Sequence, residues 1–295
     1  MGACVYTVPQ DEIKYLAAYK IMLEQKLTFA AMPPSTLYYL RPYFPSIHLP
    51  DLKYSLLGGE PFPEELAAGW EHCVPHAIIQ NIYGPTEVAI NCLIYDWNGP
   101  RGTRKAHNGT VSIGKPFGTN VARVLNDRME PVKPFETGEL WMGGGQVSPG
   151  YWNNQEPDRK AFSGINYRGR TMRFYRTGDM VTIDGEGDIM FLNRRDEQVQ
   201  VQGYRVEPGE IEQIARKHLD GMNVVAMGIE NRPGEMKLYL LVEGEKIDQK
   251  SLMQFLSDRL PHYMVPAKVV VLSEFPRLVS GKLDRKALFQ IVKVE

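Results

Sequence analysis

The chain has 295 residues, of which 43% are hydrophobic and 23% are charged. This composition is typical of a globular protein with one large or two ordinary domains, and it excludes a disordered or fibrous chain. With 34 Lys and Arg residues against 35 Asp and Glu residues, the formal charge is −1. The sequence therefore offers no general attraction to nucleic acid or to an anionic membrane.

The cysteines and the first residues of the chain exclude further classes of protein. Cys4, Cys73 and Cys92 are odd in number and widely spaced, which argues against a disulfide framework or a zinc cluster. We expect all three to be small buried hydrophobic residues. No stretch is long and apolar enough to span a bilayer, and residues 1–10 lack the charged and then apolar pattern of a secretory signal. These features favour a cytoplasmic protein without a membrane partner.

The first hundred residues alternate strand and helix patterns. In chain order, we expect a strand at 2–8, a helix at 11–25, a strand at 27–32, a helix at 35–41, a strand at 54–57, a helix at 63–73 and a strand at 77–80. This rhythm predicts βαβ units with a parallel sheet. Because parallel sheets bind ligands at the carboxyl ends of their strands, the loops after 54–57 and 77–80 are candidate sites.

Short β segments separated by Gly and Pro follow from about Thr110 to residue 195. They lie at 111–114, 120–125, 138–142, 179–183 and 188–192. Such a pattern predicts a separate antiparallel subdomain. A glycine run at 143–145 lies in this region, but neither Gly-Lys-Ser/Thr nor a helix follows it. We therefore interpret the run as a turn and not as a phosphate-binding loop.

The last hundred residues predict a small α+β domain at 196–295, after a larger domain at 1–195. Its expected elements are a hairpin at 198–206, a helix at 208–218, strands at 224–229 and 237–242, a helix at 249–259, a strand at 267–272 and a final helix from residue 284. The predicted fold class is thus α/β, with a partial parallel layer, an antiparallel subdomain and a small α+β domain.

The loop at 81–87 carries the first candidate chemistry. Its Gly-Pro pair cannot continue a strand, so the chain must turn there and display polar groups. The Tyr83 ring could stack on a purine, and the Asn81 amide could meet a ring-edge amino group. The Thr86 hydroxyl suits a phosphate oxygen, and the Glu87 carboxylate is a hard ligand for Mg²⁺. An ordinary Gly-Pro loop with a capping Thr explains the same seven residues, so both interpretations stay open on this motif alone.

Three further residues also allow two interpretations. Gly58 and Gly59 would let the backbone approach a flat base or a small side chain, but a turn that leads into the next helix needs the same residues. Asp179 follows a tight Thr-Gly turn. Its two oxygens could accept hydrogen bonds from both hydroxyls of a ribose, or they could cap the turn.

Seven motifs occur in a fixed order along the chain. They are Asn-Ile-Tyr-Gly-Pro-Thr-Glu at 81–87, Gly-Glu-Leu to Gly-Tyr at 138–151, Tyr-Arg-Thr-Gly-Asp at 175–179, Arg-Arg-Asp-Glu-Gln at 194–198, Gly-Tyr-Arg-Val-Glu at 203–207, Leu-Pro-His-Tyr-Met-Val-Pro at 260–266 and Ser-Gly-Lys-Leu-Asp-Arg at 280–285. In this order the chain resembles the adenylate-forming (ANL) superfamily. It is most similar to the amino-acid adenylation domains of nonribosomal peptide synthetases and to the D-alanine carrier-protein ligases. The resemblance covers nearly the whole chain, from about residue 2 to residue 288.

The resemblance implies an activity and the molecules that take part in it. An amino acid or similar small carboxylate would be activated with ATP and Mg²⁺ as an acyl-adenylate, and then transferred to the phosphopantetheine thiol of a carrier protein. The antiparallel subdomain would be a distorted β-barrel. The small domain would rotate about a hinge at Asp196, so that one active site serves both half-reactions.

The resemblance also implies roles for particular residues. Lys282 is the expected catalytic residue, because its ammonium would offset the negative charge that builds on the α-phosphate during carboxylate attack. Glu87 would hold Mg²⁺, and Gly203 would leave space for the pantetheine arm. The residues expected to contact the nucleotide are Gly58, Gly59, Glu60, Asn81, Ile82, Tyr83, Gly84, Thr86, Glu87, Asp179, Arg194 and Lys282. The residues that match the acyl pocket are Ala31, Leu56, Gly58, Ile82, Ile90 and Asn91, mostly small or apolar, which suggests a small or aliphatic amino acid.

Family members are much longer at the amino end. This chain lacks the Ser/Thr/Gly-rich phosphate loop, and it lacks the Phe-Asp segment whose carboxylate holds an amino acid's ammonium group. We therefore expect a natural or artificial fragment, or one piece of a split enzyme whose partner is a missing amino-terminal piece. The alternatives are an acyl-CoA or aryl-acid ligase of the same superfamily and a catalytically inactive binding fragment.

Overall fold

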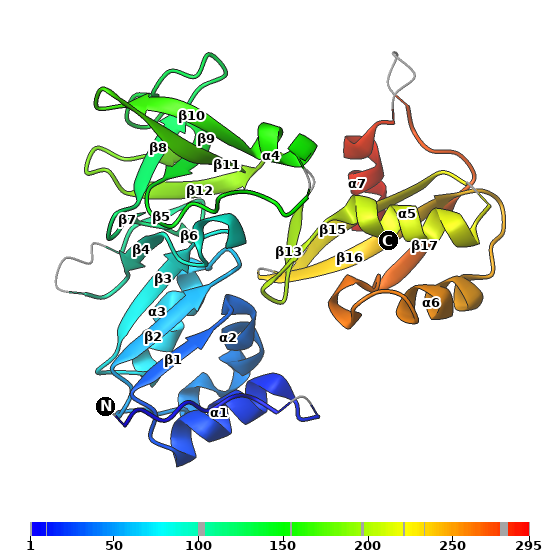
Figure 1. Ribbon diagram of the computed structural model, residues 1–295. Coiled ribbons are helices and arrows are strands. Elements are labelled where there is room, and N and C mark those ends of the chain that lie inside the picture. Colours follow the sequence, from blue (N-terminus) through cyan, green and yellow to red (C-terminus); the bar gives the residue numbers. More distant parts are fainter. Residues whose placement is uncertain are drawn as a thin grey trace. The chain divides into compact units, whose positions relative to one another are not determined.

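The structure, a computed structural model, describes residues 2–9, 11–99, 104–153, 155–195, 198–220, 222–232, 234–277 and 283–294. The chain divides into two compact units, Met1–Asp196 and Glu197–Glu295, whose elements are labelled in Figure 1. Among the helices in the described ranges, none is both long and apolar enough to cross a membrane.

The first unit contains the predicted βαβ layer. Three strands pair in parallel: β1 (Phe29–Met32), β2 (Tyr54–Gly58) and β3 (Ile78–Tyr83). Two more extend the sheet in antiparallel fashion: β4 (Leu93–Asp96) and β7 (Lys115–Pro116). The helices of the layer are α1 (Lys14–Glu24), α2 (Pro34–Leu40) and α3 (Glu64–Cys73), with the 3-10 helices η1 (Arg41–Ser46) and η2 (Thr86–Val88). Sequence reasoning placed the three parallel strands and missed β4.

The predicted strand at 2–8 is wrong. Residues 2–9 have no regular secondary structure, and nearly all of their side chains are exposed. Because no neighbouring strand supplies cross-strand pairs, the apolar pattern alone does not stabilise a strand here. Cys4 is exposed, contrary to prediction, whereas Cys73 and Cys92 are buried as expected. Burial raises the pKa of Cys73 to about 11 and that of Cys92 to about 12, which is typical of unreactive core thiols.

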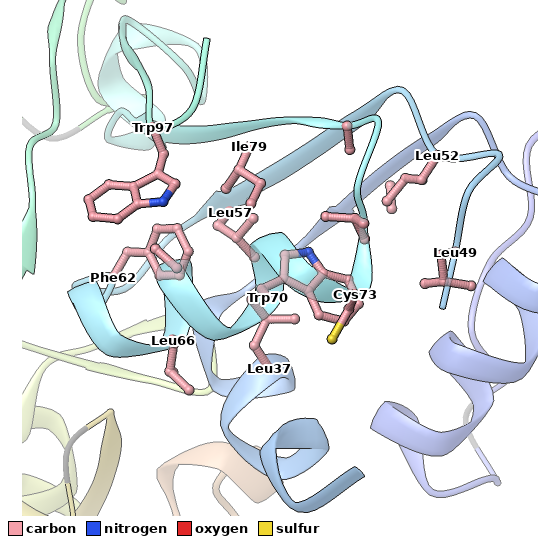
Figure 2. Packing of buried hydrophobic residues seen from close by; sticks show 14 of the residues in the cluster. Leu37, Leu49, Leu52, Leu57, Phe62, Leu66, Trp70, Cys73, Ile79 and Trp97 are labelled. Atoms are coloured by element: carbon pink, nitrogen blue, oxygen red, sulfur yellow. The ribbon is translucent and has the colours of Figure 1, made fainter. Parts of the chain in front are cut away.

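A core on one side of the parallel layer centres on Trp70 of α3. Figure 2 shows its indole among apolar side chains that include Leu37 of α2 and Leu57 of β2. The buried positions of α3 are 66, 67, 70 and 73, which is the spacing of one helix face. Trp70 Nε1 donates a hydrogen bond to Ser55 Oγ at 2.9 Å. The indole N–H is therefore paired where burial without a partner would be costly.

The second sheet of this unit is antiparallel and has the strand order β10-β11-β9-β8, with β12 paired to β11. Its strands are β8 (Val121–Leu125), β9 (Thr137–Gly143), β10 (Phe162–Tyr167), β11 (Arg170–Ile183) and β12 (Ile189–Arg194). Helix α4 (Gln155–Ala161) precedes β10, and the short strands β5 (Ala106–His107) and β6 (Thr110–Val111) form a separate pair. A parallel layer followed by an antiparallel sheet is the predicted arrangement for this part of the chain.

One charged cluster, here called the Lys105 group, ties the segment before β5 to the β11–β12 turn. Lys105 Nζ donates to Asp184 Oδ2 and Asp188 Oδ2, each at 2.6 Å, and to Glu186 Oε2 at 2.7 Å. Burial by itself would lower the pKa of Lys105, but hydrogen bonds to the three carboxylates raise it above its usual value. The Lys105 group therefore holds two distant segments together through one ammonium.

The second unit is a small α+β structure. In its main sheet, β15 (Val224–Arg232) is antiparallel to β16 (Glu235–Glu243), and β17 (Lys268–Leu272) is parallel to β16. The hairpin of β13 (Val199–Val201) and β14 (Tyr204–Val206) precedes α5 (Pro208–His218). The remaining helices are α6 (Gln249–Ser257), η3 (His262–Met264) and α7 (Arg285–Val294). These elements match those expected after residue 198, and the α/β fold class is confirmed.

Candidate functional site

Four of the predicted pocket residues share one face of the parallel layer. Ala31 pairs with Leu56 across β1 and β2, and Gly58 pairs with Ile82 across β2 and β3. Side chains alternate along a strand, and the intervening positions of β2 point into the core around Trp70. The four pocket positions therefore lie on the opposite face, and none of the four is fully buried.

Gly58, Gly59 and Glu60 have structural roles at the end of β2. A Cβ on Gly58 would lie 2.5 Å from Ile82 Cγ1, so the missing side chain makes room for Ile82. Gly59 has a φ of 83°, a left-handed turn that favours glycine. Glu60 Oε2 accepts a hydrogen bond from Ser35 N at 2.8 Å in the first turn of α2, where a carboxylate is stabilising. Contacts of these three residues with a nucleotide stay a prediction.

The Gly-Pro loop ends β3 as expected from the sequence. After Tyr83 the chain turns through η2 and returns, so that Cys92 N donates to the Tyr83 carbonyl at 2.8 Å. Gly84 lies against the backbone of Ile90, where a Cβ would overlap the carbonyl oxygen. Thr86 and Ile90 are both exposed on this loop. The loop thus presents one hydroxyl and one aliphatic side chain to solvent.

Asn81 lies within β3 and is almost completely buried. Its Nδ2 donates to the carbonyl oxygens of Ser112 at 2.9 Å and Val111 at 3.2 Å. The amide nitrogen therefore ties β3 to the segment at β6. Sequence reasoning did not predict this role, and the predicted contact with a ring-edge amino group would fall to the amide oxygen.

Tyr83, Asp179 and Arg194 form a second charged cluster, here called the Asp179 group. The Tyr83 hydroxyl donates a hydrogen bond to Asp179 Oδ2, and Arg194 Nη1 donates to Asp179 Oδ1 at 2.7 Å. Asp179 and Arg194 are register partners on β11 and β12, and Asp179 is only 5% exposed. Tyr83 joins them although it is 96 residues from Asp179 in sequence. Three residues predicted separately as nucleotide contacts are therefore in direct contact.

The predicted Thr-Gly turn is wrong, because Thr177 and Gly178 lie inside β11, where the pairing with β9 is irregular between Arg176 and Met180. The backbone of this segment is fixed around the same carboxylate. Thr177 Oγ1 donates to the Leu140 carbonyl at 2.7 Å and accepts from Asp179 N at 3.0 Å. Arg194 Nη2 also donates to the Thr177 carbonyl at 3.0 Å. Asp179 is thus held in one orientation by its backbone and by its side chain. Thr177 is a residue that sequence reasoning missed, although it lies inside the quoted motif at 175–179.

Electrostatics in the Asp179 group keep Tyr83 neutral. Burial raises the pKa of Tyr83 well above its ordinary value, and the negative charge of Asp179 raises it further. The phenol therefore remains a hydrogen-bond donor at neutral pH. A carboxylate with oriented oxygens next to an aromatic ring is chemically suited to a ribose and a base.

Glu87, the predicted metal ligand, is buried and oriented by a tyrosine. The Tyr151 hydroxyl donates to Glu87 Oε1 at 2.6 Å, and Ser148 N donates to the Glu87 carbonyl at 2.8 Å. Burial, followed by the hydrogen bond to Glu87, raises the pKa of Tyr151. Mg²⁺ is commonly held by one or two carboxylates together with substrate phosphates, and a single oriented glutamate fits such a site. Tyr151 was not predicted as a site residue, although the motif at 138–151 ends on it.

The other expected functional residues belong to the end of the first unit or to the second unit. Asp196, the predicted hinge, and Lys282, the predicted catalytic residue, lie outside the described residues. Gly203 has a φ of 80° in the turn between β13 and β14, where glycine is favoured for its backbone freedom. A role for Gly203 in admitting a pantetheine arm stays a prediction.

Comparison with known proteins identifies the family. The family model for the AMP-binding enzyme matches residues 1–152. One polypeptide of the linear gramicidin synthase of Brevibacillus parabrevis is 36% identical over 276 residues, which is 91% of this chain and 3% of that polypeptide. Delta-poly-L-ornithine synthetase of Acinetobacter baumannii is 36% identical over 249 residues, which is 81% of this chain and 18% of that protein. The chain therefore belongs to the AMP-binding enzyme family, as the sequence motifs predict.

A solved structure covers the whole chain. The adenylation domain AlmE of Vibrio cholerae, in complex with glycyl-adenosine-5'-phosphate, is 27% identical and superposes with a TM-score of 0.84. The match includes 100% of this chain and 55% of that chain. The chain thus spans about half of this solved adenylation domain and a small part of the much longer curated relatives.

Proposed function

We propose that this chain forms part of an adenylation domain that joins an amino acid to AMP and then passes the acyl group to a carrier-protein thiol. The observation that carries this proposal is the Asp179 group, in which a carboxylate held by Arg194 lies against the hydroxyl of Tyr83. Ile82, the residue before Tyr83 in β3, belongs to the apolar face with the pocket positions. The proposed base-binding ring and the proposed acyl-binding face therefore belong to consecutive residues at one strand end.

Each part of the nucleotide has a residue of suitable chemistry. The Tyr83 ring offers its face to the purine, and the Asp179 oxygens accept from ribose hydroxyls. Arg194 donates to Asp179 and adds positive charge on the phosphate side. Thr86 offers its hydroxyl to a phosphate oxygen, and bound Mg²⁺ at Glu87 would offset phosphate charge.

The reaction needs no protein nucleophile. A carboxylate oxygen of the amino acid attacks the α-phosphorus of ATP, the bond to the bridging oxygen breaks, and pyrophosphate leaves with the electron pair. A pantetheine thiolate then attacks the acyl carbon, and AMP leaves. In this scheme Lys282 stabilises the charge on the α-phosphate during the first step, Asp196 is the hinge between the two steps, and Gly203 borders the path of the thiol.

The relatives support the amino-acid branch of the family. One of them is named as a synthetase of poly-L-ornithine, and the AlmE structure contains a glycyl group joined to adenosine phosphate. The pocket positions on the sheet face are Ala31, Leu56, Gly58 and Ile82. Their small and aliphatic side chains favour a small or aliphatic amino acid as the substrate.

Calorimetric titration of the purified chain tests the proposal. The ligands are AMP, ATP with Mg²⁺, and a panel of aminoacyl-sulfamoyl adenosines, which are stable mimics of the acyl-adenylate. We expect one small or aliphatic mimic to bind at least about tenfold more tightly than AMP, because it occupies both parts of the site. Absence of binding by all of these ligands would contradict the proposal.

Two further assays separate the alternatives. Pyrophosphate exchange with the same amino acids measures the first step, and acyl transfer to a carrier protein or to coenzyme A identifies the acceptor. Transfer to coenzyme A alone would favour the acyl-CoA ligase alternative. Tight binding of a mimic without exchange would favour the inactive binding fragment.

A further inference from the structure

The turn after the Gly-Pro loop has a backbone conformation that its residues disfavour. Ala89 has a φ of 52° and Ile90 a φ of 72°. A left-handed conformation is uncommon for any residue except glycine, and it is an outlier for a β-branched side chain such as isoleucine. Ile90 is 72% exposed, so burial of its own side chain does not compensate for the strain. Other contacts must hold this turn.

Gln146, in the loop after β9, donates to the carbonyl oxygens on both sides of Ile90. Its Nε2 lies 3.1 Å from the Asn91 oxygen and 3.5 Å from the Ala89 oxygen. Asn91 N in turn donates to the Ala89 carbonyl at 2.9 Å. One side-chain amide thus links the carbonyl groups of the two residues on either side of the strained Ile90.

The orientation of the Gln146 amide is itself fixed. Asn120 Nδ2 donates to Gln146 Oε1, and Asn120 is only 7% exposed. Because the Gln146 oxygen accepts from Asn120, its NH₂ group is the one that faces the turn. Gly144 has a φ of 118°, and a Cβ there would overlap the Thr119 carbonyl. The glycine run at 143–145 therefore allows the close approach of the loop after β9 to residues 119–120.

We propose that Gln146 is a positioning residue that holds Ile90 and Asn91 in the conformation needed for the acyl side of the site. This inference rests on the proposed function, since Ile90 and Asn91 are the two pocket positions that lie on a loop and not on a strand. Gln146 contributes through the backbone of these residues, and its own contact with the substrate is not required. Changes at Gln146 should alter amino-acid recognition more than nucleotide recognition.

Two substitutions separate hydrogen-bond donation from space filling. Gln146→Met keeps the length of the side chain and removes its polar atoms. Gln146→Glu keeps the acceptor for Asn120 but places an oxygen against the two carbonyl groups, which it would repel. We expect both variants to fold and to weaken binding of the tightest aminoacyl-sulfamoyl adenosine about 5- to 10-fold, as for the loss of about one hydrogen bond. AMP affinity should stay within about twofold.

Hydrogen exchange of the full chain gives a second readout that does not depend on any ligand. In the two Gln146 variants, the amide of Cys92 should exchange about tenfold faster, while amides of α3 should be unchanged. Gln254→Met removes an exposed glutamine from α6 and is the matched control. In an Ile90→Gly background, which removes the left-handed penalty, Gln146→Met should accelerate the same amide much less.

The outcomes distinguish the two proposals. Unchanged exchange at Cys92 in both Gln146 variants would overturn the positioning role. Faster exchange with equal weakening of AMP and of the aminoacyl mimic would overturn the assignment to the acyl side. If no mimic binds more tightly than AMP even before substitution, the proposed function fails, and the exchange measurement still decides whether Gln146 holds the turn.

Discussion

The β11–β12 hairpin carries a charged cluster at each end, and the two are built in opposite ways. At its turn, the Lys105 group places one ammonium among three carboxylates. At its open end, the Asp179 group places one carboxylate between a guanidinium and a phenol. In the first case the protein supplies a cation to neutralise acids that lie close together. In the second it supplies donors that orient a single acid.

From this difference we infer that the Lys105 group is structural and that the Asp179 group belongs to the proposed site. The acids of the Lys105 group come from one short turn, and their partner joins them to the β5 region, so the cluster acts as a crosslink. The donors of the Asp179 group come from β3 and β12. Strand β3 also carries a predicted pocket position, and β12 is the last strand of the first unit. We therefore expect substitutions in the Lys105 group to change stability alone and substitutions in the Asp179 group to change ligand binding as well.

The largest expected effect on stability is that of Lys105→Met. Without the ammonium, the side chains of Asp184 and Asp188, which are 15% and 10% exposed, repel each other. The free energy of unfolding, measured in urea, should fall by about 2–3 kcal/mol, less than for a fully buried pair because Glu186 is solvated. Lys115→Met is the control, since Lys115 is half-exposed and 3.7 Å from Asp188, and it should cost less than about 0.5 kcal/mol. A loss of AMP affinity in Lys105→Met would contradict its purely structural role.

Asp179→Asn should have a smaller effect on stability and a large effect on binding. It removes the negative charge that accepts from the Arg194 guanidinium, which is only 13% exposed, and this should lower the free energy of unfolding by about 2 kcal/mol. AMP affinity should fall by about 100-fold, because the neutral amide accepts only weakly from ribose hydroxyls. The matched variant Asp184→Asn should retain AMP affinity within about twofold. An equal loss of AMP affinity in Asp179→Asn and Asp184→Asn would contradict the proposed difference between the two clusters.

The Lys105 group should also make stability depend on pH. Burial alone would raise the pKa of Asp184, but the hydrogen bond from Lys105 and those from the amides of Asp188 and Glu186 lower it below its ordinary value. A lowered pKa contributes stability that is present above the unfolded-state value of about 4 and is lost as the pH falls through the folded-state value. As the pH falls below 4, the free energy of unfolding measured in urea should therefore decrease by about 1 kcal/mol more in the unsubstituted chain than in Asp184→Asn. Parallel curves for the two proteins would rule out this contribution.

The smallest expected effect is that of Tyr83→Phe, which keeps the ring and removes the hydroxyl donor. The free energy of unfolding should fall by about 1 kcal/mol or less, and AMP affinity by about threefold, because stacking is retained and only the orientation of Asp179 is weakened. Tyr95→Phe is the control, since the buried Tyr95 hydroxyl accepts from Lys105 N at 2.8 Å, away from the Asp179 group. It should lower stability by a similar amount and leave AMP affinity unchanged. A loss of AMP affinity as large as that of Asp179→Asn would show that the hydroxyl, and not the ring, is the main nucleotide contact.

Local patterns predicted most of the elements because each strand and helix depends on periodicity within a few residues. The parallel strands, the helix α3 and the elements after residue 198 follow from that periodicity. The strand at 2–8 failed for the complementary reason, since a strand needs a neighbour that no local pattern can reveal. β4 was missed because its apolar run directly follows the Gly-Pro loop and has only four residues.

The site shows the same limit at longer range. The motifs identified Tyr83, Asp179 and Arg194 one by one, but spacing in sequence does not predict that a phenol 96 residues away donates to the carboxylate. Glu60 and Asn81 were predicted to contact a nucleotide. In the structure, a carboxylate oxygen of Glu60 accepts a hydrogen bond from the first turn of α2, and the amide nitrogen of Asn81 donates to backbone carbonyls at β6. Gln146 was overlooked because its amide nitrogen donates to backbone carbonyls, and a pattern of side-chain types does not show such contacts.

The turn that brings Tyr151 to Glu87 also provides an optical reporter. The next residue, Trp152, is 91% exposed, whereas Trp70, Trp97 and Trp141 are at most 5% exposed. A water-soluble collisional quencher should therefore extinguish the fluorescence of Trp152 first and leave emission from the three interior indoles. The quenchable fraction of the fluorescence, which comes from Trp152, should change when the segment next to Glu87 moves or becomes shielded. The remaining emission, from the three buried tryptophans, should change when the protein unfolds. One unlabelled sample can therefore report both events.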